Sequence, residues 1–295
     1  MISGKEPVSL KKQKEYLNYL SKTPEKTSDY SFVNINGWSE AYQLMWYFTD
    51  QLIWLDQTKS EHVFWAPIGD WYHVDWLSVF NQMALPVKFT RVPEKLLNIW
   101  KDCGGLVLDI VEERDNWDYV YSTADLIHLK GNRYHKKKNL LNQFNKKYNF
   151  QYYALNAERI DETLAMQEDW CTWRDCESDK TLASENRAIA NVLDAYRSFD
   201  NICGGVIFVN QLITAYTVAE YFSDEMIIIH FEKGCPMYKG AYQAINQLFL
   251  SNDASSKYKW VNREQDLGDS GLRKAKMSYH PSYFLKKFSV QVALK

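Results

Sequence analysis

Glycine and proline are scarce in this chain of 295 residues, which contains 12 and 7 of them. So few chain breakers favour long regular elements joined by short loops and exclude a collagen-like or low-complexity chain. Neither sign of charge dominates, because 35 basic residues face 37 acidic ones. A protein that binds nucleic acid over its whole surface is usually clearly basic, so that class is disfavoured, whereas a local basic patch is allowed.

Cysteines and long apolar segments are also few. The five cysteines are odd in number and scattered, which does not resemble a disulfide framework and favours a reducing compartment. The longest apolar runs are far shorter than the roughly 20 residues that cross a membrane. The N-terminus has no apolar signal core. We therefore expect a soluble, cytoplasmic protein with no membrane span.

The chain does contain strand and helix patterns that mix throughout its length. Residues 30–35 are predicted to form a strand and residues 38–48 a helix after an Asn-Gly turn, and a meander of three antiparallel strands is predicted between residues 205 and 231. This mixture indicates an α+β fold with mixed α/β layers. The length fits two domains of about 150 residues, so we expect domains at 1–150 and 151–295.

The first candidate site is a strand–loop–helix unit at residues 226–250. A buried strand leads into a short loop, and a helix is predicted to begin near Gly240. Free N–H groups at a helix N-terminus favour a phosphate, and Lys233 and Lys239 would add positive charge. The loop lacks the spacing of a P-loop or a dinucleotide fingerprint. An ordinary strand-to-helix turn, with glycines that only serve its geometry, therefore remains an alternative.

The second candidate is a basic segment at residues 130–147, which contains no acidic residue. Such a segment could bind the phosphates of RNA or of a cofactor. A solvated helix face is the alternative, because most runs of like charge have no other role. The candidate residues for binding a polyanion are Lys130, Arg133, Lys136, Lys137 and Lys138.

The third candidate is a polar stretch at residues 261–280, where Asn262, Arg263 and Glu264 follow a predicted strand. Polar residues at this position are common in ligand clefts, and His230 on a neighbouring strand could join them. An ion-pair network that holds the last helix is the alternative. A metal site is disfavoured, because His230 and Glu232 have no second cluster at zinc-like spacing.

Residues 119–144 and 261–281 resemble a bacterial family related to the C-terminal catalytic domain of phosphatidylglycerol lysyltransferases, once called DUF2156. The likeness is carried by Asp-Leu-Ile-His-Leu-Lys-Gly-Asn-Arg-Tyr-His-Lys-Lys-Lys-Asn at residues 125–139 and by the stretch from Asn-Arg-Glu-Gln-Asp-Leu-Gly to Tyr-His-Pro at residues 262–281. It extends over most of residues 30–290. The resemblance implies two GNAT-like acyltransferase domains in tandem, related to Fem-type enzymes that move amino acids from aminoacyl-tRNA.

In GNAT folds a central strand separates from its neighbour, and the donor's pyrophosphate lies on the N-terminus of the following helix. By this likeness residues 226–231 form the separating strand, and the donor site lies in the second domain. Backbone N–H groups near Phe231 and Lys233 would hold the oxyanion. The implied phosphate loop consists of Tyr238, Lys239, Gly240 and Ala241.

The sequence therefore predicts a transferase that moves an acyl or aminoacyl group from acyl-CoA or aminoacyl-tRNA to an amine or hydroxyl. Direct attack on the donor carbonyl needs a base, an oxyanion donor and an acid. Glu220, Glu232 and Glu264 are the candidate bases, and Tyr279 is the candidate acid. Coenzyme A or acyl-CoA is the candidate cofactor, and no metal is expected. The alternative is a non-catalytic nucleotide- or RNA-binding module on a transferase fold.

Overall fold

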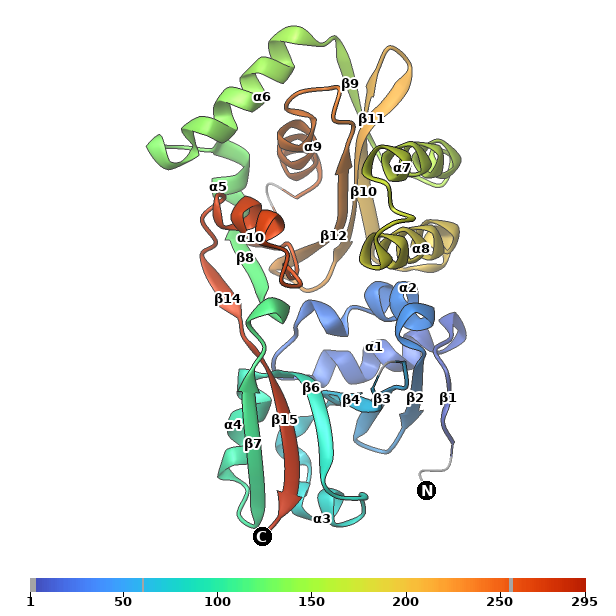
Figure 1. Cartoon of the computed structure of the whole chain (residues 1–295), viewed down its shortest axis with the longest axis vertical. Coiled ribbons are helices and arrows are strands. Elements are labelled where there is room, and N and C mark those ends of the chain that lie inside the picture. Colours follow the sequence, from blue (N-terminus) through green and yellow to red (C-terminus); the bar gives the residue numbers. More distant parts are fainter. Residues whose placement is uncertain (1–3, 60, 255–256) are drawn as a thin grey trace. The chain divides into compact units, whose positions relative to one another are not determined.

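A computed structural model describes residues 4–59, 61–254 and 257–295 (Figure 1). The chain forms two compact units. The first comprises Met1–Asp118, Gln265–Gly268 and Phe284–Lys295, and the second comprises Tyr119–Glu264 and Asp269–Tyr283. This division differs from the expected boundary at residue 150. The reason is strand pairing, because the strand at Asp118–Ser122 pairs with the second sheet and the last strand pairs with the first.

The first unit is a mixed sheet covered by four helices. Its strands lie in the order β1-β2-β3-β4-β6-β15-β7, with β5 paired to β3. The strands are β1 (Glu6–Pro7), β2 (Leu44–Phe48), β3 (Leu52–Gln57), β4 (Val63–Trp65), β5 (Ile68–Gly69), β6 (Val87–Pro93), β7 (Leu106–Glu112) and β15 (Lys287–Leu294). The helices are α1 (Gln13–Lys22), α2 (Phe32–Tyr42), α3 (Trp76–Asn81) and α4 (Glu94–Asp102).

The second unit has its own sheet, with α7 and α8 on one side and α9 on the other, beside α6 (Figure 1). Its strands are β8 (Asp118–Ser122), β9 (Phe150–Ala154), β10 (Ile202–Val209), β11 (Leu212–Tyr221), β12 (Met226–Gly234) and β13 (Trp260–Asn262), and β14 (Tyr283–Leu285) leads back towards the first sheet. The helices are α5 (Thr123–His128), α6 (His135–Lys147), α7 (Ile160–Arg174), α8 (Lys180–Asp194), α9 (Ala241–Phe249) and α10 (Ser270–Met277).

The two sheets share one strand order. In the first unit the order β2-β3-β4-β6-β15 contains a single parallel pair, β4 with β6. In the second the order β10-β11-β12-β13-β8 contains a single parallel pair, β12 with β13. The predicted meander is confirmed as β10, β11 and β12, which pair antiparallel in sequence. The two units are thus structural duplicates, and the predicted α+β class is confirmed.

The segment at residues 30–48 differs from its prediction. The helix α2 begins earlier than expected, because the Ser31 hydroxyl caps it by accepting a hydrogen bond from the Asn34 N–H at 3.2 Å. It ends at Gln43, whose φ of 50° is left-handed. The expected strand is therefore the start of a helix, and the second half of the expected helix is β2. The apolar residues on both sides of the junction suit either periodicity.

The cysteines also differ from expectation, because Cys171 and Cys176 at the end of α7 form a disulfide. Cys103, Cys203 and Cys235 form no disulfide with a described residue. Within the described ranges, the helices are all too short or too polar to cross a membrane.

The helix α9 packs closely on α6 through Gly240. A Cβ at this position would meet the carbonyl oxygen of Leu140 and lie 3.0 Å from Cβ of Phe144, and its φ is 93°. Gly131 has a similar φ of 89°, but nothing lies within 4 Å of its Cβ position. The two glycines share a backbone constraint and differ in packing.

We expect Gly131→Ala to lower the free energy of unfolding by about 1–2 kcal/mol through left-handed strain. Gly240→Ala should lower it by about 1–3 kcal/mol more, because overpacking is added to the same strain. Urea denaturation of both variants measures the difference. Equal losses would contradict the close contact between α9 and α6.

Candidate active site

The parallel strands of the second sheet separate soon after they meet. The strands β12 and β13 pair at only three positions, of which Ile228↔Asn262 is the last. The strand β12 continues to Gly234, and His230 forms a bulge in its pairing with β11. A bulge bends a strand. The separation places the side chains after Ile228 on β12 opposite those that follow Asn262, as the resemblance implied.

An arginine–glutamate pair occupies this separation. Arg263 donates from Nη2 to Oε1 of Glu232 at 2.9 Å, and Nδ2 of Asn246 donates to the other oxygen at 2.9 Å. Nη1 of Arg263 is buried and makes no hydrogen bond to any residue that the structure describes. Both oxygens of Glu232 are thus engaged, so this predicted base holds the arginine in place. Nη1 therefore keeps a hydrogen-bonding capacity that Glu232 does not use.

Tyr279 and Lys137 complete the group around Arg263. The guanidinium carbon of Arg263 lies 5.0 Å from the centre of the Tyr279 ring, and Nζ of Lys137 lies 4.3 Å from the same ring. Burial raises the pKa of Tyr279, against the opposing effect of Arg263. Burial also lowers the pKa of Lys137, as does the nearby Arg263. The phenol therefore stays protonated and can donate a proton.

The basic segment divides into one inner and several outer residues. Lys137 is half-buried beside Tyr279, whereas the other four candidates, Lys130, Arg133, Lys136 and Lys138, are exposed. Of these, Arg133 forms an ion pair with Asp125 at 3.0 Å. The exposed lysines form a basic surface at the start of α6, and the buried stripe of that helix is formed by Leu141 and Phe144.

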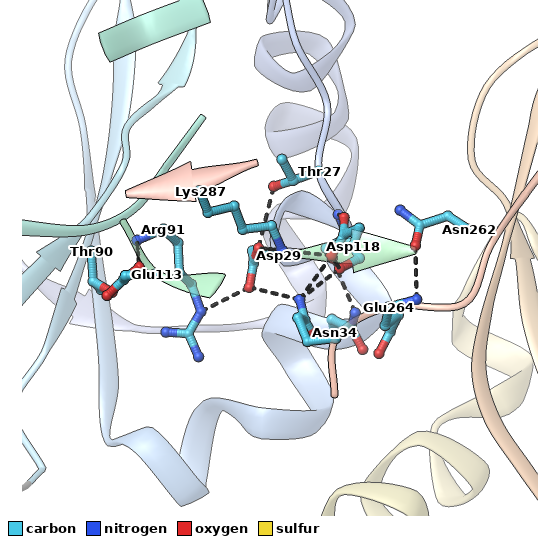
Figure 2. A network of polar contacts seen from close by, with 12 residues as sticks. Thr27, Asp29, Asn34, Thr90, Arg91, Glu113, Asp118, Asn262, Glu264 and Lys287 are labelled. Atoms are coloured by element: carbon cyan, nitrogen blue, oxygen red, sulfur yellow. Dashed lines mark hydrogen bonds and ion pairs between the residues drawn. The ribbon is translucent and has the colours of Figure 1, made fainter. Parts of the chain in front are cut away.

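The other two predicted bases meet at His230. Nδ1 of the imidazole lies 2.8 Å from Glu264, and Nε2 lies 3.3 Å from Glu220. Burial lowers the pKa of His230, but the two carboxylates outweigh it and raise the pKa to about 9. Asn262 in turn fixes Glu264 by accepting a hydrogen bond from its N–H at 2.8 Å (Figure 2). The two glutamates therefore stabilise an imidazolium and are not free bases.

The predicted phosphate loop is filled by protein. Gly240 faces the backbone of α6, the Tyr238 ring lies 5.1 Å from that of Tyr148, and Lys239 is exposed. The N–H of Ala241 donates to the carbonyl of Tyr238 at 3.0 Å. A phosphate cradle needs a glycine that faces the ligand, whereas this one faces a helix.

Lys233 does not add charge to that loop. Its ammonium pairs with Glu185 at 2.7 Å and lies 3.9 Å from the Trp170 ring centre, against α7 and α8. Successive strand residues point to opposite faces, so Lys233 lies away from Glu232. Phe231 is buried. The side chain of Lys233 therefore does not support the predicted donor site.

Asn246 is the residue of the site that the sequence analysis missed. It is 1% exposed among the buried positions of α9 and binds Glu232. A polar residue at a core-facing helical position is a usable signal, because burial requires a partner. Among the described residues, no group of three or more His, Cys, Asp or Glu side chains could hold a metal ion.

The pKa of His230 makes stability depend on pH. A group whose folded pKa is raised stabilises the fold fully below its unfolded value, about 6.5, and loses this effect as the pH rises through about 9. We expect the free energy of unfolding to fall by on the order of 3 kcal/mol between pH 6 and pH 9.5. Chemical denaturation across this range should show a much flatter profile for His230→Gln. An equally steep profile in the variant would assign the effect to other groups.

Three solved structures are similar to this chain over nearly their whole length. A conserved protein of unknown function from Bacteroides thetaiotaomicron VPI-5482 is 26% identical, with a TM-score of 0.89 and full coverage of both chains. L-PGS from Bacillus licheniformis has a TM-score of 0.66 at 11% identity, over 99% of this chain and 94% of that one. FemX has a TM-score of 0.59 at 8% identity, over 97% and 96%. The last two show the fold alone, which extends over nearly the whole of each chain.

Sequence comparison gives a relative and a family. An uncharacterised protein of Mycoplasmoides gallisepticum (strain R(low / passage 15 / clone 2)) is 25% identical over 192 residues, which are 63% of this chain. The match spans 59% of that relative's length. The model of the family described as phosphatidylglycerol lysyltransferase, C-terminal, matches residues 21–291. The match covers most of the chain, so this protein belongs to the phosphatidylglycerol lysyltransferase C-terminal family.

Proposed function

We propose that the second unit transfers an aminoacyl group from aminoacyl-tRNA to a hydroxyl or amine acceptor. The observation that carries this proposal is the group around Arg263, where strands β12 and β13 separate. There a guanidinium with a free nitrogen, a buried phenol and a half-buried ammonium converge. The family match and the aminoacyltransferase-like fold support the same class of reaction.

The donor is better matched by tRNA than by coenzyme A. A pyrophosphate would need the N-terminus of α9, where Gly240 packs against α6. A polynucleotide instead needs an exposed basic surface, and α6 offers one through Lys136 and Lys138. Lys137 on the same turn reaches the Tyr279 ring. A tRNA backbone held on the exposed lysines would therefore have its acceptor end close to Arg263.

The chemistry can be assigned to these side chains. The acceptor's oxygen or nitrogen attacks the ester carbonyl, and the bond between that carbon and the ribose oxygen breaks. Nη1 of Arg263 and the ammonium of Lys137 stabilise the negative charge that develops on the carbonyl oxygen. Tyr279 gives its proton to the leaving ribose oxygen and receives the proton of the acceptor. Glu232 and Asn246 keep Arg263 in place.

We expect Tyr279→Phe to slow transfer by about a hundredfold or more, because the phenol proton is lost while the ring still packs. The assay follows the loss of aminoacyl ester from mixed charged tRNAs, with a cell extract of lipids and small amines as acceptor. Tyr153→Phe, at a half-exposed tyrosine on β9, is the matched control. An unchanged rate in Tyr279→Phe would remove the phenol from the mechanism. Retained tRNA binding with no transfer in the parent protein would favour the non-catalytic RNA-binding module.

Binding of tRNA should depend steeply on salt. Several phosphates that release counterions would weaken binding about tenfold or more between 50 and 200 mM salt. Replacing the exposed Lys136 and Lys138 by Ala should flatten this dependence, whereas Lys22→Ala and Lys295→Ala, at exposed positions of the first unit, should not. Filter binding measures both. A salt-independent affinity would favour a small donor such as acyl-CoA.

A further inference from the structure

The first unit contains its own separation of parallel strands. The strands β4 and β6 pair only at Phe64↔Phe89 and Trp65↔Thr90. The next residue on β6 is Arg91. In the shared strand order β6 corresponds to β13. Arg91, which follows the last paired residue of β6, therefore corresponds to the residues that follow Asn262 in the second sheet. The proposed function does not use this site.

The backbone of Arg91 is fixed in an unusual conformation. Its φ is 57°, in the left-handed region that residues with a Cβ rarely adopt. The Glu113 carboxylate holds it there, accepting from the Arg91 N–H at 2.9 Å and from the Thr90 hydroxyl at 2.8 Å. Such conformations persist only where the surroundings determine them, and they cluster at binding sites.

The side chain of Arg91 is also held in place, but only through its Nε atom. Nε donates to Oδ1 of Asp29 at 2.7 Å, and Asp29 is anchored by Lys287, which also pairs with Asp118 at 2.6 Å. Figure 2 shows the two terminal nitrogens of Arg91 pointing away from this network. They make no hydrogen bond to any other residue within the described ranges. The side chain is 11% exposed.

Aromatic rings form a surface beside these nitrogens. The guanidinium carbon of Arg91 lies 4.1 Å from the Trp65 ring centre and 5.1 Å from that of Tyr42. The Tyr42 ring lies 5.5 Å from Trp65 and 5.8 Å from Trp38. Trp38 and Tyr42 are half-buried, so they leave a partly open row of rings next to a charged fork. An aromatic or apolar group could pack on this row.

The local charge selects the kind of anion. Three carboxylates, Asp29, Asp118 and Glu113, face two cations, Arg91 and Lys287. The network therefore carries a net charge of about −1 when all five groups are ionised. A dianionic phosphate is repelled more strongly than a monoanion. The two terminal nitrogens of an arginine also match the two oxygens of a carboxylate.

We propose that Arg91 binds the carboxylate of a ligand whose aromatic or apolar part packs on Tyr42 and Trp38. The ligand class is an N-acylated amino acid or a peptide C-terminus with an aromatic side chain. The left-handed backbone and Asp29 hold the guanidinium before the ligand arrives, which lowers the entropy lost on binding.

The test compares N-acetyl-L-phenylalanine with its carboxamide, which differs only by lacking the charge. We expect the acid to shift the indole N–H resonance of Trp65 or Trp38 in a saturable NMR titration. The affinity of the amide should be lower by a factor of about ten or more. Arg91→Lys should weaken binding of the acid about fivefold or more, because lysine cannot form the bidentate pair. Inorganic phosphate should bind more weakly than the acid.

The matched control is Arg114→Lys, because Arg114 also lies over aromatic rings and pairs with an aspartate, Asp266. This variant should bind the acid as the parent does. If Arg91→Lys fails to fold, Trp38→Ala at the half-buried end of the row should still weaken binding. Equal affinity for acid and amide, no saturable binding, or tighter binding of phosphate would each overturn the proposal, and none of these results bears on transfer by the second unit.

Discussion

The short parallel pair between β12 and β13 constrains the whole second unit. Beyond Ile228 and Asn262 the two strands no longer bond to each other, yet their backbone groups still need partners. The chain after β13 continues its pairing with β8: the Arg263 N–H donates to the carbonyl of Tyr119 at 2.9 Å, and the Tyr119 N–H donates to that of Glu264 at 3.2 Å. The space beside β12 is then left to side chains.

Charged side chains line that space, and each must be compensated because isolated buried charges are strongly disfavoured. Glu232 balances Arg263, and two glutamates balance His230. Compensation is incomplete at Nη1 of Arg263, which is buried with no hydrogen bond to the described residues. The first unit repeats this arrangement with Arg91 and Asp29. In both units an arginine next to separated parallel strands is fixed by a carboxylate and keeps donors free, which is a chemical basis for binding an anion or a developing oxyanion.

Much of the second unit follows from local sequence. The alternation in residues 205–231 specifies the meander, and the Ser122 hydroxyl caps α5 as an N-cap serine does, accepting from the Asp125 N–H at 3.3 Å. The polar residues after β13 could also be identified from the sequence, because polar side chains at the end of a strand are common in ligand clefts. The pairing of Arg263 with Glu232 and of His230 with Glu264 could not, since residues more than 30 apart in the chain meet only through the sheet.

Other features depend on tertiary structure. Gly240 stands at the predicted start of a helix, as in a phosphate loop, yet its neighbour is a helix some hundred residues earlier in the chain. Lys137 cannot be told from Lys136 or Lys138 by charge, and only the fold brings it to Tyr279. The observed division after Asp118 could not be predicted, because β15 returns to the first sheet from the far end of the chain. Local patterns do not specify such long-range pairings.

The most direct test is a crystal structure with 3′-amino-3′-deoxyadenosine carrying an amide-linked amino acid, a stable mimic of the aminoacyl end of tRNA. The analogue should lie between β12 and α10, with its carbonyl oxygen within hydrogen-bonding distance of Nη1 of Arg263 and its ribose beside the Tyr279 hydroxyl. An analogue bound at residues 238–241, or elsewhere with Arg263 and Tyr279 untouched, would contradict an aminoacyl-transfer site at the separation of the two strands.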